Sequence, residues 1–276
     1  MSKLDVLAIG PHPDDVELGC GGTLALAARQ GRRVGILHLT RGERGTRGTP
    51  EQRLAEAEQA AAALGAVELA FLDCGDGALR YGEPEEEALI EVLRTWRPEL
   101  VLGPPRHDRH PDHERGHRLV AAAAFYSGLQ ARGSRALAAH RPAAVFSYMQ
   151  HHTFEPSFVV DVTAAWEAKM AALAAYRSQI YQPGAGGGAD SGVSGATGGH
   201  RDSRGQGIGV EAGLAKDSGA GTGPLTKVSS REFRLAVEGR ARHFGQLIGA
   251  ELGEPFWSPQ PLAVADLLAL VPRGPR

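Results

Sequence analysis

Leu4-Asp5-Val6-Leu7-Ala8-Ile9 is a short apolar run that stops at Gly10-Pro11. A run of this length, bounded by turn residues, predicts a strand buried inside a sheet. Further strand-like runs cover residues 33–39, 68–72 and 100–103, and helix-forming segments between them cover residues 22–29, 52–64 and 85–96. Strands alternating with helices in this way predict a Rossmann-like α/β fold. We expect a mostly parallel, doubly wound sheet flanked by helices.

The second half continues the pattern until the composition changes. Expected elements are helices at residues 114–129, 166–176 and 230–248 and strands at residues 144–148 and 158–162. Residues 184–223 contain 15 glycines and no aromatic residue, so this stretch cannot bury enough apolar surface to order itself. Because helix-forming sequence resumes after it, we predict a flexible insertion within a single domain covering residues 1–276.

Composition and charge exclude several classes of protein. The formal net charge is −2, which gives no electrostatic footprint for nucleic acid. No apolar run reaches the length of a membrane span, and the N-terminus lacks the pattern of a signal peptide. The two cysteines, Cys20 and Cys74, fit a reducing compartment in which thiols stay unpaired. The sequence therefore predicts a cytoplasmic protein with neither a nucleic-acid nor a membrane partner.

Two polar clusters follow the first and fourth predicted strands. Residues 11–15 read Pro-His-Pro-Asp-Asp, and residues 107–113 read His-Asp-Arg-His-Pro-Asp-His. In parallel sheets the carboxyl ends of the strands meet at one edge, so both clusters should converge there with residues 40–48 and 73–77. Two histidines and a carboxylate are suitable zinc ligands that leave one position open for water. For either cluster alone, solvated loop residues are an equally good interpretation.

A competing metal motif lies inside the second cluster. His113-Glu114-Arg115-Gly116-His117 matches H-E-x-x-H, in which two histidines one helical turn apart bind zinc. Gly116 weakens a helix there by about 1 kcal/mol relative to Ala. This interpretation also leaves the histidine and carboxylates of residues 11–15 without a role, so we disfavour it. His117 is then expected to support the site or to be an ordinary helix residue.

The two clusters together resemble the zinc-dependent de-N-acetylases of the LmbE/PIG-L family. The resemblance rests on His12-Pro13-Asp14-Asp15 and His110-Pro111-Asp112-His113. Other segments are similar to its bacillithiol-biosynthesis deacetylase branch, namely residues 19–23, 39–43, 45–49, 176–179, 242–245 and 253–256. The similarity covers nearly the whole chain except the glycine-rich insertion. It implies a cytoplasmic amide hydrolase that often forms trimers or hexamers.

The resemblance also implies roles for individual residues. Zinc would be held by His12, Asp15 and His113, with Asp14 taking a proton from the water that the metal activates. A protonated His110 would stabilise the tetrahedral oxyanion, and Asp112 would orient its ring and raise its pKa. Ligand type does not distinguish zinc from iron or cobalt. Nor does the sequence decide whether Asp14 or His110 protonates the leaving amine.

The expected substrate is a small anionic N-acetyl sugar conjugate. Five arginines follow the strand ends, at positions 41, 44, 47, 53 and 109. We expect Arg53 and Arg109 to bind substrate, since arginine grips carboxylates with two hydrogen bonds, and at least half of the five to be solvated. The resembled branch cleaves the acetyl group from N-acetylglucosaminyl malate. Alternatives are a deacetylase of another small N-acetyl sugar or thiol conjugate, and a non-catalytic metal- or nucleotide-binding module.

Overall fold

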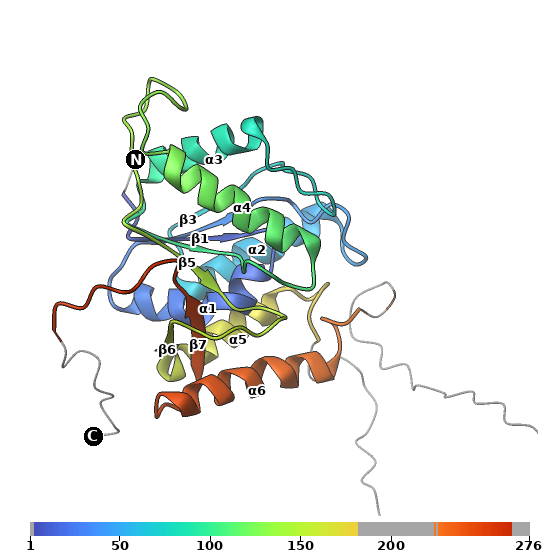
Figure 1. The fold of residues 1–276 in the computed structure, drawn as a ribbon. Helices are drawn as coiled ribbons and strands as arrows, with labels where there is room; N and C mark the ends of the chain where they lie inside the picture. Colours follow the sequence, from blue (N-terminus) through green and yellow to red (C-terminus); the bar gives the residue numbers. More distant parts are fainter. Residues whose placement is uncertain (1–2, 182–223, 225, 267–276) are drawn as a thin grey trace, which may run out of the picture.

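The computed structural model describes residues 3–181, 224 and 226–266. The insertion predicted at residues 184–223 lies outside the described residues. Within them, seven strands form one sheet in the order β3-β2-β1-β4-β5-β7-β6 (Figure 1). The strands are β1 (Val6–Gly10), β2 (Val34–His38), β3 (Glu68–Phe71), β4 (Leu100–Gly103), β5 (Ala144–Tyr148), β6 (Phe158–Asp161) and β7 (Gly253–Trp257).

The sheet is mostly parallel, as the sequence predicts. Strands β1 to β5 pair in parallel, and β1 lies centrally between β2 and β4. Strand β7, which the sequence analysis did not anticipate, runs antiparallel between β5 and β6. It contains Pro255 and only five residues, so its sequence lacks an ordinary strand pattern. The α/β class is therefore confirmed, with one antiparallel strand added near the edge.

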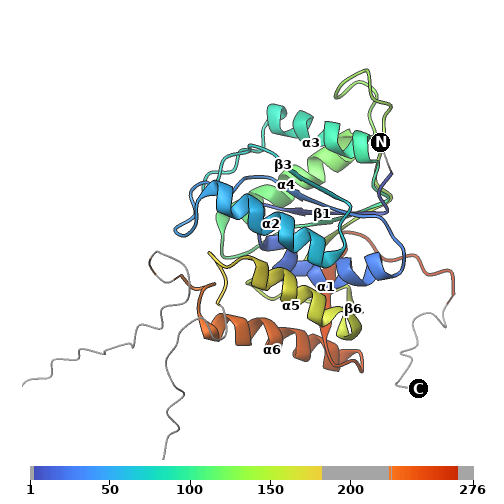
Figure 2. The ribbon, with the colours of Figure 1, turned by 180° about the vertical axis from the view of Figure 1, so that it is seen from behind.

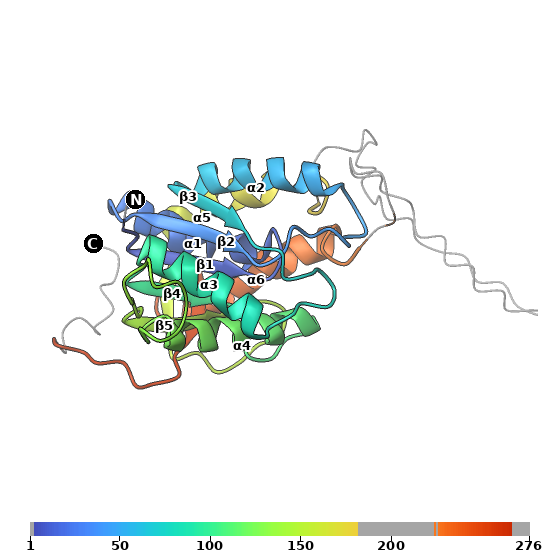
Figure 3. The same cartoon turned by 90° about the horizontal axis from the view of Figure 1, so that it is seen from above.

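Helices cover both faces of the sheet (Figure 3). They are α1 (Asp15–Arg29), α2 (Pro50–Leu64), α3 (Glu83–Trp96), α4 (Pro111–Tyr126), α5 (Trp166–Ala175) and α6 (Arg231–Leu247). Helices α1, α2 and α5 pack on one face, and α3 and α4 pack on the other. Helix α6 lies outside α5, as Figure 2 shows from behind. Among the described helices, none has the length and apolar character needed to span a membrane.

Side chains of β1 alternate between the two helix layers. Leu7 and Ile9 join the apolar core beneath α3 and α4, whereas Ala8 joins the core beneath α1, α2 and α5. Each of these three residues is fully buried. A central parallel strand buried on both faces reads as a continuous apolar run, which is why the stretch at residues 4–9 predicts it. The same burial fixes the carboxyl end of β1, from which the first polar cluster emerges.

Helices α1 and α4 begin earlier than the sequence suggests. Helix α1 starts at Asp15 and not near residue 22, because Asp14 caps it with a left-handed backbone (φ 102°). The helix then kinks at Cys20, within the glycine-rich segment that hides its start in the sequence. Helix α4 starts at Pro111, after His110 as N-cap. Both polar clusters therefore lie at helix N-termini.

A buried carboxylate ties the α1 kink to β7. Glu254 accepts hydrogen bonds from the backbone N–H groups of Gly22 (2.9 Å) and Thr23 (2.7 Å). It also forms a buried ion pair with Lys169 of α5 at 2.6 Å. A Cβ on Gly19 would meet the ring of Tyr148 at 2.2 Å, so the helix approaches β5 closely only because this position is glycine. These contacts hold the N-terminal turn of α1 against the sheet.

Candidate metal centre and active-site cleft

The segments after β1, β2, β3 and β4 converge on one cleft of about 240 Å³. Its described lining includes His12, Asp14, Asp15, Arg44, Arg53, Asp76, Arg109, His110, His113, Gln150 and His151. The expected meeting of residues 10–15, 40–48, 73–77 and 104–113 is therefore what the structure shows. The loop after β5 adds two residues that the sequence analysis did not include.

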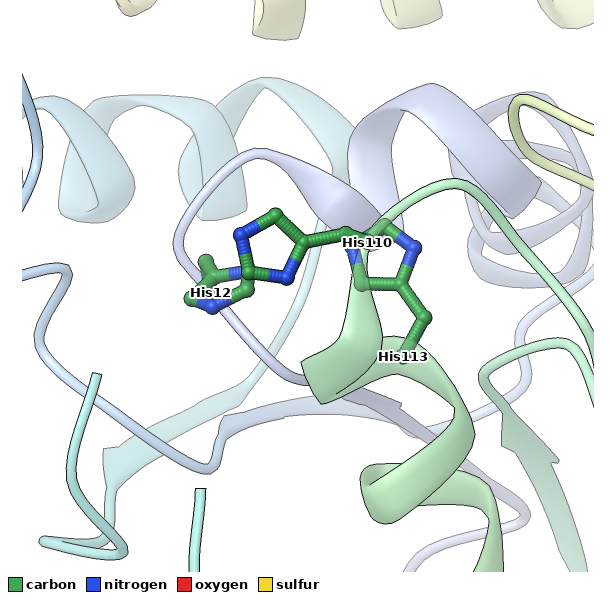
Figure 4. Close-up of side chains that lie close together, drawn as sticks. All are labelled: His12, His110 and His113. Atoms are coloured by element: carbon green, nitrogen blue, oxygen red, sulfur yellow. The ribbon is translucent and has the colours of Figure 1, made fainter. Parts of the chain in front are cut away.

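His12, Asp15 and His113 meet at the floor of this cleft. Nδ1 of His12 lies 3.1 Å from Oδ2 of Asp15, and Nε2 of His113 lies 3.3 Å from Oδ1 of the same carboxylate. All three residues are buried. Figure 4 shows His12 on one side and His110 and His113 at the start of α4 on the other, with the ring of His110 between those of His12 and His113 in this view. Asp15 therefore stands between two imidazole nitrogens, one from the loop after β1 and one from the first turn of α4.

In both His12 and His113, the outer ring nitrogen, which is the one that does not face Asp15, contacts a carboxylate. Nε2 of His12 lies 3.2 Å from Asp76 and 3.3 Å from Asp112, and Nδ1 of His113 lies 2.6 Å from Asp108. Burial would raise the pKa of Asp112, but hydrogen bonds from His12 and the Leu79 backbone lower it to about 2. Burial and the His113 hydrogen bond oppose each other in the same way at Asp108, whose pKa is also about 2. These ionised carboxylates fix which nitrogen of each ring faces inward.

Asp15 has its own supporting contacts. Its Oδ2 accepts the backbone N–H of His12 at 2.8 Å, and its Oδ1 accepts a short hydrogen bond from the Nε2 amide of Gln150. Burial would raise the pKa of Asp15, yet His113 and His12 hold it well below its usual value. The carboxylate is therefore ionised and held in place before any ligand arrives.

The donor set fits a divalent metal. Metal-ligating histidines usually donate their outer N–H to a carboxylate, which orients the ring and leaves the inner nitrogen for the ion. By distance, two groups of described residues bring their donor atoms within 4.8 Å of one another: His12 with His110 and His113, and His12 with Asp76 and Asp112. Neither group contains Asp15, whose place beside the two histidines rests on its contacts with them. In the second group both carboxylates already accept backbone N–H groups, from Arg44 and Leu79. We therefore assign that group to support of His12.

Asp14 lies beside the floor without joining it. It lines the cleft, and its Oδ2 is 4.0 Å from Nη2 of Arg53. Burial and the charge of Asp15 raise the pKa of Asp14 to about 7, against the opposing charge of Arg53. Asp14 is the N-cap residue of α1 and has a left-handed backbone, with φ 102°.

His110 and Asp112 do not form the pair expected from the sequence. The Asp112 carboxylate contacts His12, whereas Nδ1 of His110 accepts the backbone N–H of Asp112 at 3.2 Å. Burial and the neighbouring His12 and His113 lower the pKa of His110, so the expected protonated form is disfavoured. The reason is geometric: His110 is the N-cap of α4, which commits Nδ1 to the helix as an acceptor. Nε2 then carries the proton of the neutral ring.

The arginines divide between the cleft and the scaffold. Arg44, Arg53 and Arg109 line the cleft, and of these Arg44 and Arg109 are exposed. Arg53 is 5% exposed and donates to the carbonyls of Gly42 (3.0 Å) and Pro13 (2.7 Å), so two of its donors hold the two loops together. Arg47 is buried and donates to the carbonyl of Ser178 at 2.8 Å. Arg41 is exposed and is not among the described residues that line the cleft.

The H-E-x-x-H alternative has no geometric support in the described residues. Nδ1 of His117 lies 3.2 Å from both the Pro104 carbonyl and the hydroxyl of Ser147. Nδ1 of His117 is thus occupied by groups of the scaffold. This residue therefore links α4 to β4 and β5.

Sequence reasoning missed Asp76, Asp108 and Gln150 as supporting residues. Asp76 lies in the segment expected at the cleft, and Asp108 lies within the second cluster, so position was a usable signal for both. Gln150 follows β5 without any pattern that distinguishes it from a loop residue.

Comparisons with known proteins identify related deacetylases. The family model described as PIG-L, GlcNAc-PI de-N-acetylase, matches residues 7–124. Diacetylchitobiose deacetylase of Thermococcus kodakarensis is 32% identical over 186 residues, 63% of this chain and 70% of that protein. The probable N-acetyl-alpha-D-glucosaminyl L-malate deacetylase 2 of Bacillus cereus is 30% identical over 193 residues, 63% of this chain and 83% of that protein. A conserved protein of Thermus thermophilus superposes with TM-score 0.75 at 33% identity, covering 96% of this chain and 98% of that one.

Fold and site together define a hydrolase of N-acetyl amides, in a class where metal dependence is typical. The chain belongs to the PIG-L (LmbE-type) family of de-N-acetylases.

Proposed function

We propose that this deacetylase is zinc-dependent and removes the acetyl group from N-acetylglucosaminyl malate, a step of bacillithiol biosynthesis. The observation that carries the proposal is the cleft floor, where His12 and His113 face the two oxygens of Asp15 with Asp14 beside them. His12, Asp15 and His113 would hold the metal. When bound, zinc supplies a Lewis acid that lowers the pKa of a water and polarises an amide carbonyl.

Asp14 would act as the general base. Its carboxyl group faces the cleft and, with a pKa of about 7, can take a proton from the attacking water and release it again near neutral pH. The proton would then pass to the nitrogen of the departing amine. Arg53 would keep Asp14 in place, because it also binds the Pro13 carbonyl in the same turn.

His110 would stabilise the developing oxyanion as a neutral donor. Because Nδ1 accepts the Asp112 backbone N–H, Nε2 is the nitrogen that can donate to the carbonyl oxygen. A positioned donor of this kind contributes about 3–4 kcal/mol to the barrier in acyl transfer. Asp112 would act on the other side, through the ring of His12.

The cationic rim favours an anionic substrate. Arg109 and Arg44 line the cleft with exposed guanidinium groups, and Arg53 adds a third positive charge below them. The Bacillus cereus relative bears a name that specifies a malate conjugate, which matches such a rim. A neutral disaccharide is the second candidate, because the Thermococcus kodakarensis relative is named for diacetylchitobiose.

The test combines metal analysis with a substrate series. Purified protein is assayed by elemental analysis, and amine release from N-acetylglucosamine, N,N′-diacetylchitobiose and N-acetylglucosaminyl malate is measured before and after chelation. We expect one zinc per chain, chelator-sensitive hydrolysis and the highest kcat/KM with the malate glycoside. Equal rates on all three substrates would contradict the malate assignment. Hydrolysis that survives full metal removal would contradict the metal assignment.

A further inference from the structure

A second, larger cavity of about 630 Å³ lies beside the metal cleft. It is lined by residues at the ends of β5 and β7, where Ser147 pairs with Trp257 across the two strands. Ser147 stands at the carboxyl end of a parallel strand, so this cavity opens on the same edge of the sheet as the cleft. None of the residues assigned above to metal binding or proton transfer lines it.

His151 separates the two cavities and lines both of them. Its ring stacks on that of His113, with the ring centroids 5.9 Å apart and the planes inclined by 11°. Its backbone N–H donates to the Asp108 carboxylate, which also holds His113. The ring of His151 therefore contacts a proposed metal ligand and also lines the second cavity. A substrate that spans both cavities would pass this ring.

The chemistry of the second cavity favours an anion. None of its described lining residues is acidic, and Arg106 contributes a positive charge. Of the three histidines that line it, His151 is uncharged near neutral pH because burial lowers its pKa to about 4. Cζ of Arg106 lies 4.8 Å from the ring centroid of Trp257, and among the described residues no carboxylate lies within ion-pair distance of it. Stacking on an aromatic ring restrains a guanidinium group and leaves its N–H edge free for a carboxylate. Ser147 and Thr153 add hydroxyl groups, and Phe154 adds an aromatic face.

We propose that this cavity binds the carboxylate-bearing aglycone of the N-acetyl sugar, with Arg106 as its counter-ion and Trp257 as its wall. The inference rests on the proposed deacetylase function and adds where the second half of the substrate lies. It assigns the aglycone to the β5–β7 side of the cleft and not to the arginine-rich loop at residues 41–48. Arg106 then determines specificity without touching the reacting amide.

The test compares Arg106→Gln with Arg109→Gln, and uses Arg135→Gln as a matched control on an exposed loop. Steady-state kinetics are measured on zinc-loaded protein with N-acetylglucosamine and with N-acetylglucosaminyl malate. For Arg106→Gln we expect KM for the malate glycoside to rise about tenfold, the loss of one charge-assisted contact, with kcat within twofold. The kcat/KM for N-acetylglucosamine should stay within twofold. Trp257→Leu should give the same pattern, and Arg135→Gln should change neither substrate.

Calorimetric binding of the malate glycoside, measured on zinc-loaded protein that also carries Asp14→Asn to suppress turnover, provides a readout that does not depend on catalysis. Binding about tenfold weaker in Arg106→Gln supports the inference. Unchanged binding in that variant, a larger loss in Arg109→Gln, or an equal loss for both substrates would overturn it. Wild-type protein that binds the malate glycoside but hydrolyses none of the substrates would instead contradict the deacetylase proposal and leave the cavity assignment standing. Wild-type protein that does not bind the glycoside would overturn the assignment.

Discussion

The floor and the rim of the cleft are built on different principles. On the floor, His12, Asp15 and His113 are buried, and each already contacts a second group that fixes its orientation. On the rim, Arg44 and Arg109 are exposed, and among the described residues neither guanidinium group has an ion-pair partner. The floor is therefore preorganised, whereas the rim keeps its charges in solvent until a substrate brings counter-charges. Changes to the floor should affect metal binding and kcat, and changes to the rim should affect KM.

Asp14→Asn should produce the largest effect. An amide has nearly the same shape but cannot accept the water's proton, so kcat should fall by about 10²–10⁴-fold. Zinc stoichiometry should stay at the wild-type value, because Asp14 lies beside the proposed ligands and is not one of them. Elemental analysis and steady-state kinetics measure both quantities. Asp73→Asn, an exposed carboxylate near the same sheet edge, is the control. Retention of more than a tenth of wild-type kcat would show that another group is the base.

His38 lies beneath the cleft floor. It tests whether a histidine there can become positively charged when it has no carboxylate as partner. This histidine ends β2 and is fully buried, and burial lowers its pKa to about 3. The folded pKa lies below the unfolded value of 6.5, so between these values the unfolded chain binds the extra proton. The stability from neutral His38 is therefore complete above pH 6.5 and is lost as pH falls toward 3. The loss amounts to about 1.4 kcal/mol per pH unit.

Urea unfolding of metal-free protein at pH 6.5 and 4.5 measures this contribution. Wild-type protein should lose about 2.3 kcal/mol more than His38→Asn over this interval, because the unfolded histidine is already half protonated at pH 6.5. His38→Gln should behave in the same way, and the exposed His243→Asn should match wild type. Identical pH slopes for wild type and His38→Asn would mean that His38 is protonated in the folded protein.

The sequence predicts the regular part of this molecule because local pattern and tertiary structure agree there. The apolar run at residues 4–9 is buried on both faces, and the capping box at Thr49 and Gln52 begins α2 where composition predicts a helix. It does not predict β7, because a five-residue strand containing Pro255 is specified by the neighbours on either side of it. Nor does it predict the start of α1, since the capping residue has a left-handed backbone.

The site, like the fold, has a part that the sequence predicts and a part that it does not. The residues of the two clusters could be named in advance because two strand ends of a parallel sheet must lie together. The hydrogen-bond pairing among these residues could not be predicted, since the sequence does not say which imidazole ring a carboxylate such as Asp112 will contact. Gln150 depends on the position of β5 relative to α1, a long-range relation with no local signature. Hydrogen-bond partners across the cleft therefore require coordinates.

Asp76 tests how far the floor depends on its supporting carboxylates. Asp76→Asn keeps an oxygen near Nε2 of His12 but removes the charge that makes this ring a better metal ligand. Loss of such a partner weakens metal affinity by about 10–100-fold, and because Asp112 remains 3.3 Å from the same nitrogen, we expect the lower end. Competition with a chromophoric chelator measures the zinc affinity, with Asp73→Asn as control. Unchanged affinity would mean that Asp112 alone orients His12.

Arg109→Gln should give the smallest effect, and it separates the rim from the floor most directly. An exposed ion pair contributes about 0.2–1 kcal/mol, because solvent screens the charges and the long side chain must be ordered. KM for N-acetylglucosaminyl malate should therefore rise about threefold, with kcat and zinc content unchanged. Raising the salt concentration should shrink the difference between variant and wild type, since screening weakens exposed pairs first. A fall in kcat or in bound zinc would place Arg109 with the preorganised floor, and the distinction between the two regions would then fail at this residue.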